Sequence, residues 1–175
     1  EICPTGVDYL EIVSHLRKQF VESGKLPESQ KMLRDNLAKY GNPFAKDKEE
    51  RGAWLPPQYR EPKNSKNLYF VGCSSSYSST RIPKSIIRVL ESVNFDFTLM
   101  GNLESCCGDP LFRMGEEEKA NALMQQNIEV FDNLGVETIF ASCAGCYKTL
   151  KNRFPKRFKV LHITQLLHQL VKEGT

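Results

Sequence analysis

The sequence predicts an α/β fold, in which a parallel sheet with flanking helices follows an N-terminal helical arm. Two observations support this prediction. From residue 67 onward, short apolar runs alternate with segments whose apolar residues repeat at helical spacing. Before that point, two helical patterns are followed by a polar stretch. We therefore expect a helical arm and linker over residues 1–65 and an α/β domain over residues 66–175.

The arm begins with an amphipathic pattern. The apolar residues on its expected helical face are Val7, Leu10, Val13, Leu16 and Phe20. This pattern stops at Gly24, and a second helix is expected over residues 28–40. Residues 41–65 are rich in proline and charged side chains, which is typical of a linker or an extended strap. Trp54 and Tyr59 are expected to anchor this strap to a neighbouring surface.

Four strands are expected in the second part of the chain, at residues 68–71, 95–100, 136–141 and 159–161. A serine-rich turn and a helix with Ile87 and Leu90 on its apolar face separate the first two strands. A helix of about sixteen to twenty residues from Glu116, ending at Gly135, separates the next two. Strands that alternate with crossover helices form a parallel sheet with helices on both faces.

The composition describes an ordinary globular chain. It has 175 residues, of which 40% are hydrophobic and 26% charged, and this allows one domain of moderate size plus a tail. A net charge of +3 is too small to indicate nucleic-acid binding. No apolar run of about eighteen residues predicts a transmembrane segment, and no secretory signal is recognisable. We expect a cytoplasmic protein with reduced thiols, either free or peripheral to a membrane complex.

Five of the six cysteines follow the predicted strands. They are the single Cys73, the doublet Cys106 and Cys107, and the pair Cys143 and Cys146. The gaps of 32 and 35 residues between these groups are each long enough for one helix and one strand. Because the carboxyl ends of parallel strands meet at one sheet edge, all five thiols are expected there. A helix beginning near Ala144 would direct its positive end at the last pair and favour thiolates.

Thiols gathered this densely form disulfides, a soft-metal site or an iron–sulfur cluster. Disulfides fit poorly, because five cysteines cannot pair completely and the adjacent Cys106 and Cys107 would bridge only with strain. Zinc usually takes four ligands from two Cys-x-x-Cys pairs, and the chain has one such pair. Zinc therefore stays open as an alternative, together with a redox dithiol and with burial as small core residues.

The pattern Cys73 … Cys106-Cys107-Gly108 … Cys143-Ala-Gly-Cys146-Tyr147 resembles the cysteine-rich CCG domain of heterodisulfide-reductase-type iron–sulfur subunits. Similar domains occur in the iron–sulfur subunits of glycolate and lactate oxidases and of anaerobic glycerol-3-phosphate dehydrogenase. The resemblance covers about residues 67–171 and implies a Rossmann-like domain. It also implies that the five cysteines bind an iron–sulfur cluster of the 4Fe-4S type, cubane or non-cubane.

A second resemblance lies at the N-terminus. The sequence Ile2-Cys3-Pro4 is similar to the end of a bacterial ferredoxin motif, whose last cysteine precedes a proline. We therefore expect a truncated ferredoxin segment and a chain excised from a longer polypeptide. The resemblance implies, as partners, the ferredoxin-like segment and a second CCG domain of that polypeptide. It further implies flavin- or quinone-linked redox subunits.

Two main hypotheses for function follow. In the first, the chain is the iron–sulfur domain of an oxidoreductase that resembles heterodisulfide reductase, and it passes electrons from a ferredoxin domain or flavin subunit to a disulfide or related acceptor. In the second, it is an electron-relay or docking module of a glycolate, lactate or glycerol-3-phosphate oxidase complex. A structural zinc domain is a third alternative. Beyond the cysteines, no catalytic residue is assigned.

Three further residues are expected near this edge of the sheet. His162 ends the last predicted strand, and it is expected to cap the following helix or to be a satisfied core histidine rather than to contact a sulfur or shuttle a proton. Gly108 and Gly145 are expected where the backbone approaches the cluster too closely for a side chain.

Overall fold

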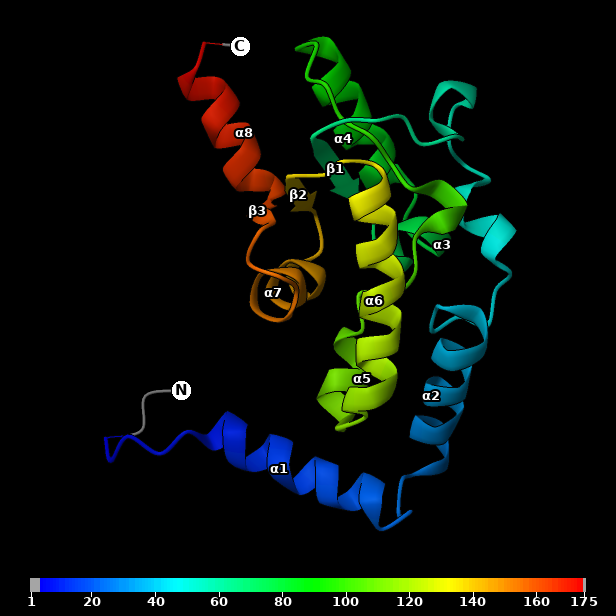
Figure 1. The fold of residues 1–175 in the computed structure, drawn as a ribbon, viewed down its shortest axis with the longest axis vertical. Helices are drawn as coiled ribbons and strands as arrows, with labels where there is room; N and C mark the ends of the chain where they lie inside the picture. Colours follow the sequence, from blue (N-terminus) through cyan, green and yellow to red (C-terminus); the bar gives the residue numbers. More distant parts are fainter. Residues whose placement is uncertain (1–3, 175) are drawn as a thin grey trace.

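The computed structural model describes residues 4–174, which form eight α-helices, three short 3₁₀-helices and one parallel sheet (Figure 1). The sheet has three strands in the spatial order β1 (Asn67–Phe70), β2 (Thr138–Ala141) and β3 (Lys159–His162). Both strand pairs are parallel, with Leu68 opposite Ile139 and Ile139 opposite Val160. The predicted fold class is therefore confirmed.

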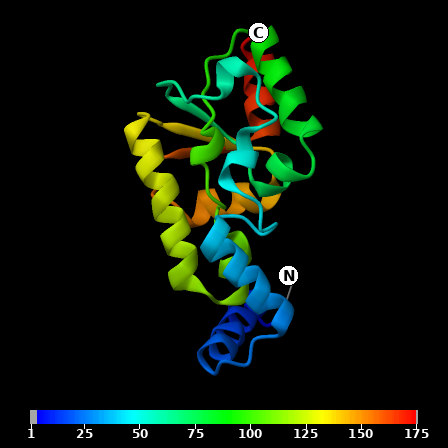
Figure 2. The ribbon, with the colours of Figure 1, turned by 90° about the vertical axis from the view of Figure 1, so that its right-hand side faces the viewer.

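Helices cover both faces of the sheet, with α6 (Glu117–Asn133) and α7 (Ala144–Arg153) on one face and α4 (Arg81–Ser92) and α8 (Ile163–Lys172) on the other (Figure 2). Successive strand side chains enter opposite cores, because strand residues alternate between faces. Phe70 and Ile139 lie in the core between the sheet and α6, which we call the α6 core. Tyr69 and Phe140 lie in the core between the sheet and α4, which we call the α4 core. The sheet is thus buried on both sides, as parallel sheets are.

The prediction of a fourth strand over residues 95–100 is wrong. Only Thr98 pairs with β1, through one bridge whose two backbone hydrogen bonds are 2.9 Å long. The ladder stops because the next N–H on that edge, from Val71, donates to the Glu104 carboxylate at 2.9 Å instead of to a backbone carbonyl. The expected minimum of four strands is corrected to three strands and one bridge within residues 4–174.

The predicted helices of this region are confirmed, and two short ones were not anticipated. These are α3 (Cys73–Tyr77), inside the serine-rich stretch, and α5 (Asp109–Met114), directly after the cysteine doublet. The long helix α6 ends where expected, because Gly135 adopts a φ of 69° that terminates the helix without steric cost. A 3₁₀ turn, η3 (Gly101–Leu103), connects the Thr98 segment to the doublet.

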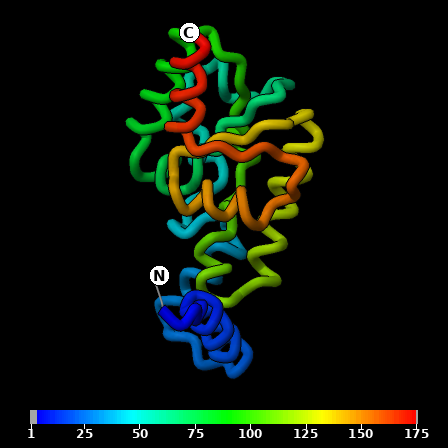
Figure 3. The backbone as a smooth tube through the Cα atoms, turned by 90° about the vertical axis from the view of Figure 1, so that its left-hand side faces the viewer, coloured from blue at the N-terminus to red at the C-terminus, as the bar shows by residue number. Residues whose placement is uncertain are grey.

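The arm consists of α1 (Tyr9–Glu22) and α2 (Glu28–Tyr40), and α1 lies at the end of the molecule away from the sheet (Figures 1 and 3). No residue of α1 is buried, and the side chain of Phe20 is 55% exposed. α1 therefore packs less tightly than the helices that cover the sheet. No described helix is both long and apolar enough to cross a membrane.

Residues 41–65, which we call the strap, contain two 3₁₀ turns, η1 (Lys48–Gly52) and η2 (Pro57–Tyr59), and run along the sheet region. Tyr59 stacks on Phe97 with ring centroids 5.4 Å apart, and Trp54 packs against the α4 core. The predicted anchoring role of the two aromatic residues is confirmed. The strap also buries the charged side chain of Arg51, which the sequence interpretation did not anticipate.

Candidate metal centre

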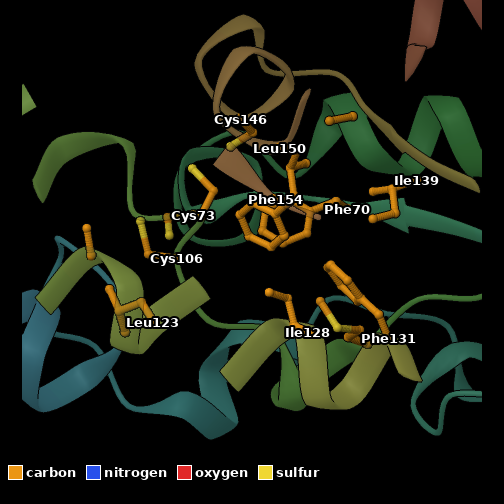
Figure 4. Close-up of a cluster of buried hydrophobic side chains, with 14 of the residues drawn as sticks. Phe70, Cys73, Cys106, Leu123, Ile128, Phe131, Ile139, Cys146, Leu150 and Phe154 are labelled. Atoms are coloured by element: carbon orange, nitrogen blue, oxygen red, sulfur yellow. The ribbon is translucent and has the colours of Figure 1, made fainter. Parts of the chain in front are cut away.

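All five candidate cysteines of the predicted edge lie where the chain leaves the sheet. Cys73 begins α3 shortly after β1, and Cys143 is the N-cap residue of α7, two positions after β2. Cys106 and Cys107 follow the segment bridged to β1. Figure 4 shows the side chains of Cys73, Cys106 and Cys146, which come from three separate chain segments, near one another. All five are free thiols, buried except for the partly exposed Cys143.

The thiols form one unbroken row of side-chain hydrogen bonds, in the order Cys73, Cys106, Cys107, Cys146 and Cys143. Cys73 and Cys143, at the two ends of the row, follow different strands, and the doublet connects them through Cys146. The expectation that the cysteines converge on one sheet edge is therefore confirmed for the positions of the thiols.

Two members of the row have pKa values well below that of an ordinary thiol. Hydrogen bonds from Cys106 and Cys146 lower the pKa of Cys107 to about 5. Hydrogen bonds from Cys146, both thiol and backbone N–H, and from the backbone N–H of Gly145 lower the pKa of Cys143 to about 5. These backbone groups belong to the first turn of α7, whose free N–H groups favour a negative charge. The effect expected for both Cys143 and Cys146 is therefore present at Cys143 but wrong for Cys146, whose pKa is raised by hydrogen bonds to Cys107 and Cys143.

The other three thiols hold their protons. The hydrogen bond to Cys107 raises the pKa of Cys106 to about 12. Hydrogen bonds to neighbouring thiols, followed by burial, raise the pKa values of Cys73 and Cys146 well above the ordinary range. A soft metal group binding the whole row would displace protons from these thiols, since thiolates are the ligands.

The row does not have the form of a single-ion site. Among residues 4–174, no three His, Cys, Asp or Glu side chains are arranged to hold one metal ion. A structural zinc ion takes four donors around one point, and the five thiols exceed that number. The donor set is one that suits soft metals and iron–sulfur groups.

Gly72 permits a close approach beside the row. Its φ of 79° lies in the left-handed region, and a Cβ atom there would lie only 3.0 Å from the Cys146 sulfur. A side chain at this position would therefore strain the backbone and displace a sulfur.

Gly72→Ala is expected to destabilise the chain by roughly 1–3 kcal/mol and to weaken metal loading, because the methyl group displaces the Cys146 sulfur. Gly135→Ala is the matched control, since its φ is 69° but no atom lies within 4 Å of the added Cβ. Both variants should unfold at lower urea concentration, and only Gly72→Ala should lose bound metal. Equal metal loss in the two variants would refute the steric explanation.

The two other glycines of the site differ from each other. A Cβ at Gly145 would lie 3.7 Å from the Cys143 sulfur and 3.3 Å from Oδ2 of Asp109, in agreement with the predicted closeness to the site. A Cβ at Gly108 would instead meet Ala120 O at 3.2 Å and the Phe112 ring at 3.3 Å. The close approach at Gly108 is thus to α6 and α5, and the expected contact there is corrected.

The sequence interpretation missed a buried ion pair beside Cys73. The guanidinium of Arg51 donates to the Cys73 sulfur at 3.6 and 3.7 Å and pairs with the Glu104 carboxylate. Burial opposes the charge of Arg51, but the carboxylate and the Cys73 sulfur outweigh it and raise the pKa of the guanidinium. The carboxylate also accepts from the N–H groups of Val71 and Gly72, both at 2.9 Å. The turn that leads into Cys73 is therefore fixed by side chains.

Asn127 of α6 fixes the cysteine doublet and was also missed. Its fully buried amide accepts from the N–H of Ser105 at 2.9 Å and donates to the carbonyls of Ser105 and Cys106 at 3.2 and 3.1 Å. The N–H of Cys106 donates to the carbonyl of Gly41 in the strap at 2.8 Å. A polar residue beside Ile128 on the buried face of a predicted helix was the signal available in the sequence.

His162 has the role expected for it. Its side chain accepts from the N–H of Thr164 and belongs to a capping box with Gln165 at the start of α8. The predicted helix cap is confirmed.

Comparison with known proteins identifies related chains. Residues 67–151 match the family model described as the CCG cysteine-rich domain. The chain is 31% identical, over 98% of its length, to 44% of a Dihydromethanophenazine:CoB--CoM heterodisulfide reductase subunit from Methanosarcina acetivorans. It is also 31% identical, over 99% of its length, to 26% of the EtfAB:quinone oxidoreductase of Syntrophomonas wolfei.

A third relative is the probable iron-sulfur-binding oxidoreductase FadF of Bacillus subtilis, 27% identical over 98% of this chain and 27% of the relative. The chain therefore spans less than half the length of these curated relatives. No solved structure matches it.

Proposed function

Because residues 67–151 belong to the cysteine-rich CCG domain family, we propose that the chain is an electron-transfer iron–sulfur domain of an oxidoreductase that resembles heterodisulfide reductase. The proposed cluster ligands are Cys73, Cys106, Cys107, Cys143 and Cys146. The related chains are named as subunits or whole enzymes of redox systems, which supports this class of function.

One observation carries the proposal: five free thiols from three chain segments form a continuous row at one edge of the sheet. Five thiols exceed the four ligands that a structural zinc ion binds, and no three of them are arranged around one ion among the described residues. We therefore propose an iron–sulfur cluster of the 4Fe-4S type, cubane or non-cubane, with zinc as the alternative to be tested.

A buried donor beside the row also fits this assignment. Nε of Arg51 is buried and has no hydrogen-bond partner among the described residues. Its guanidinium already contacts the Cys73 sulfur, so an anionic group bound next to Cys73 would provide an acceptor. The donor set and the unsatisfied N–H together support a negatively charged iron–sulfur group.

A cluster bound here would supply one-electron transfer. The chain's own residues would hold and insulate it. Four buried thiols exclude water, and backbone N–H groups of α5 and α7 donate to the sulfurs of Cys107 and Cys143. Cys143 is the partly exposed member of the row, and it marks the side on which an electron acceptor could approach.

We further propose the direction of electron flow and the partners. Electrons would arrive from a ferredoxin-like segment or a flavin-linked subunit and pass to a disulfide or a related acceptor. A second CCG domain of the parent polypeptide would complete the acceptor side. The ferredoxin-like motif at Cys3 lies outside the described residues, and it enters this proposal from the sequence alone.

A relay role in a flavin- or quinone-linked oxidase is the second candidate. It is favoured by the similarity to an EtfAB:quinone oxidoreductase and to FadF. In that role the cluster would have no substrate of its own. Rapid reoxidation of the reduced chain by small disulfides favours the reductase, whereas reoxidation only by a flavoprotein or a quinone favours the relay.

Metal analysis after anaerobic reconstitution tests the cluster itself. The chain is incubated with ferrous iron and sulfide, desalted, and assayed for iron, acid-labile sulfide and zinc. We expect about four iron and four sulfide per chain and negligible zinc, as for a 4Fe-4S group. One zinc per chain, or no iron retained after desalting, would overturn the proposal.

A further inference from the structure

Arg51 is a buried cation beside the thiol row that would not itself bind the cluster, because the five cysteines supply the proposed ligands. It comes from the strap, not from the sheet region, and its side chain is 2% exposed. We propose that Arg51 is a positioning residue that raises the reduction potential of the site by holding a fixed positive charge against Cys73. This inference rests on the iron–sulfur function proposed above.

The guanidinium is held on three sides. It pairs with the Glu104 carboxylate, donates to the Cys73 sulfur, and lies 5.6 Å from the centroid of the Tyr77 ring. An arginine does not lose its proton in a protein, so the charge is permanent. A planar guanidinium with several donors is also more rigidly oriented than a lysine ammonium.

The ion pair does not cancel the charge at the sulfur. Glu104 directs its oxygens at Arg51 and at the N–H groups of Val71 and Gly72, which share the negative charge. The guanidinium contacts both this carboxylate and the Cys73 sulfur. The charged group in direct contact with the sulfur is therefore the cation of the pair.

Reduction adds one negative charge to the cluster and its ligands. A fixed cation within 4 Å of a ligand sulfur favours the reduced form, and burial strengthens this interaction. Hydrogen bonds to cluster sulfurs are among the features that set the potential of iron–sulfur groups. Removing the guanidinium should thus make the site harder to reduce.

The test compares three variants of the full chain after anaerobic reconstitution. Arg51→Met removes the buried charge and keeps a long side chain, and Arg51→Lys keeps a charge but loses the planar donors. Arg157→Met is the control, because it removes the same charge from an exposed pair with Asp132. Dithionite titration with mediators, followed by EPR, gives the midpoint potential of each.

We expect Arg51→Met to reduce the ratio of reduced to oxidised cluster at least tenfold at the wild-type midpoint, which is about 59 mV for one electron. Arg51→Lys should lie between this value and wild type, and Arg157→Met should match wild type. A purely structural role would lower the melting temperature of Arg51→Met and leave its potential unchanged, and this result would overturn the inference.

The failures of the two proposals are distinguishable. If wild type retains no iron and sulfide, the iron–sulfur function itself fails. If wild type is loaded and Arg51→Met has the same potential, only the role of Arg51 fails. If Arg51→Met does not retain a cluster, Arg51→Gln decides, because glutamine removes the charge and keeps a polar side chain: a potential below wild type supports the role, and an unchanged potential rejects it.

Discussion

Replacement of Cys107 by serine is expected to remove nearly all iron and sulfide from the anaerobically reconstituted chain. Cys107 occupies the middle of the thiol row, and hydrogen bonds from Cys106 and Cys146 lower its pKa. A serine oxygen is a harder and poorer ligand for iron than a thiolate. Cys106→Ser should also lower the iron and sulfide content, since Cys106 connects Cys73 to the rest of the row.

Cys3→Ser is the matched control for these variants. We propose that Cys3 belongs to a separate ferredoxin-like sequence at the N-terminus, so its replacement should leave iron and sulfide at the wild-type level. Iron loss in Cys3→Ser equal to that in Cys107→Ser would show that Cys3 had been assigned to the wrong motif. Full iron content in both doublet variants would reject the cluster assignment.

Asn127→Ala is expected to lower the free energy of unfolding of the metal-free chain by roughly 3–5 kcal/mol. The amide is fully buried and makes hydrogen bonds to the N–H and carbonyl of Ser105 and to the carbonyl of Cys106. Alanine would leave these buried backbone groups without partners and release the segment before the doublet. Urea unfolding under reducing conditions measures the loss, and reconstituted Asn127→Ala should retain less iron.

Gln126→Ala provides the control on the same helix. Gln126 accepts one hydrogen bond from the hydroxyl of Ser105 at 2.9 Å, and its own side chain is exposed. Its removal should cost less than about 1 kcal/mol and leave metal loading unchanged. Equal destabilisation by the two substitutions would mean that the doublet does not depend on the buried amide.

The alternation of apolar runs and helical patterns was sufficient to predict the sheet and the edge on which the cysteines meet. Each cysteine group follows a segment aligned with the sheet, and parallel strands place their carboxyl ends together. The 95–100 segment shows where this reasoning stops. Its apolar pattern is typical of a strand, but the N–H of Val71 donates to the Glu104 carboxylate instead of to a backbone carbonyl of this segment. No local sequence pattern predicts this long-range hydrogen bond.

Arg51 could not be found from its surroundings in the sequence. It lies in the run Lys48-Glu49-Glu50-Arg51, which looks like a solvated linker, and its partner Glu104 is distant in the sequence. Charged residues are rarely buried unless they are paired, and such a pairing depends on tertiary structure. The anchoring aromatic residues of the strap were predictable because large apolar side chains in a polar stretch need a surface to cover.

The strap contacts the cysteine-rich domain closely enough that the two should be transferred together in a domain exchange. The family match begins at residue 67, yet the N–H of Cys106 is accepted by Gly41, and Glu104 takes its cation from Arg51. A shortened chain that begins at residue 66 would keep every cysteine of the row and leave a buried carboxylate without its counter-charge. Grafts that exchange such domains between redox proteins should therefore carry the preceding strap along with the cysteines it supports.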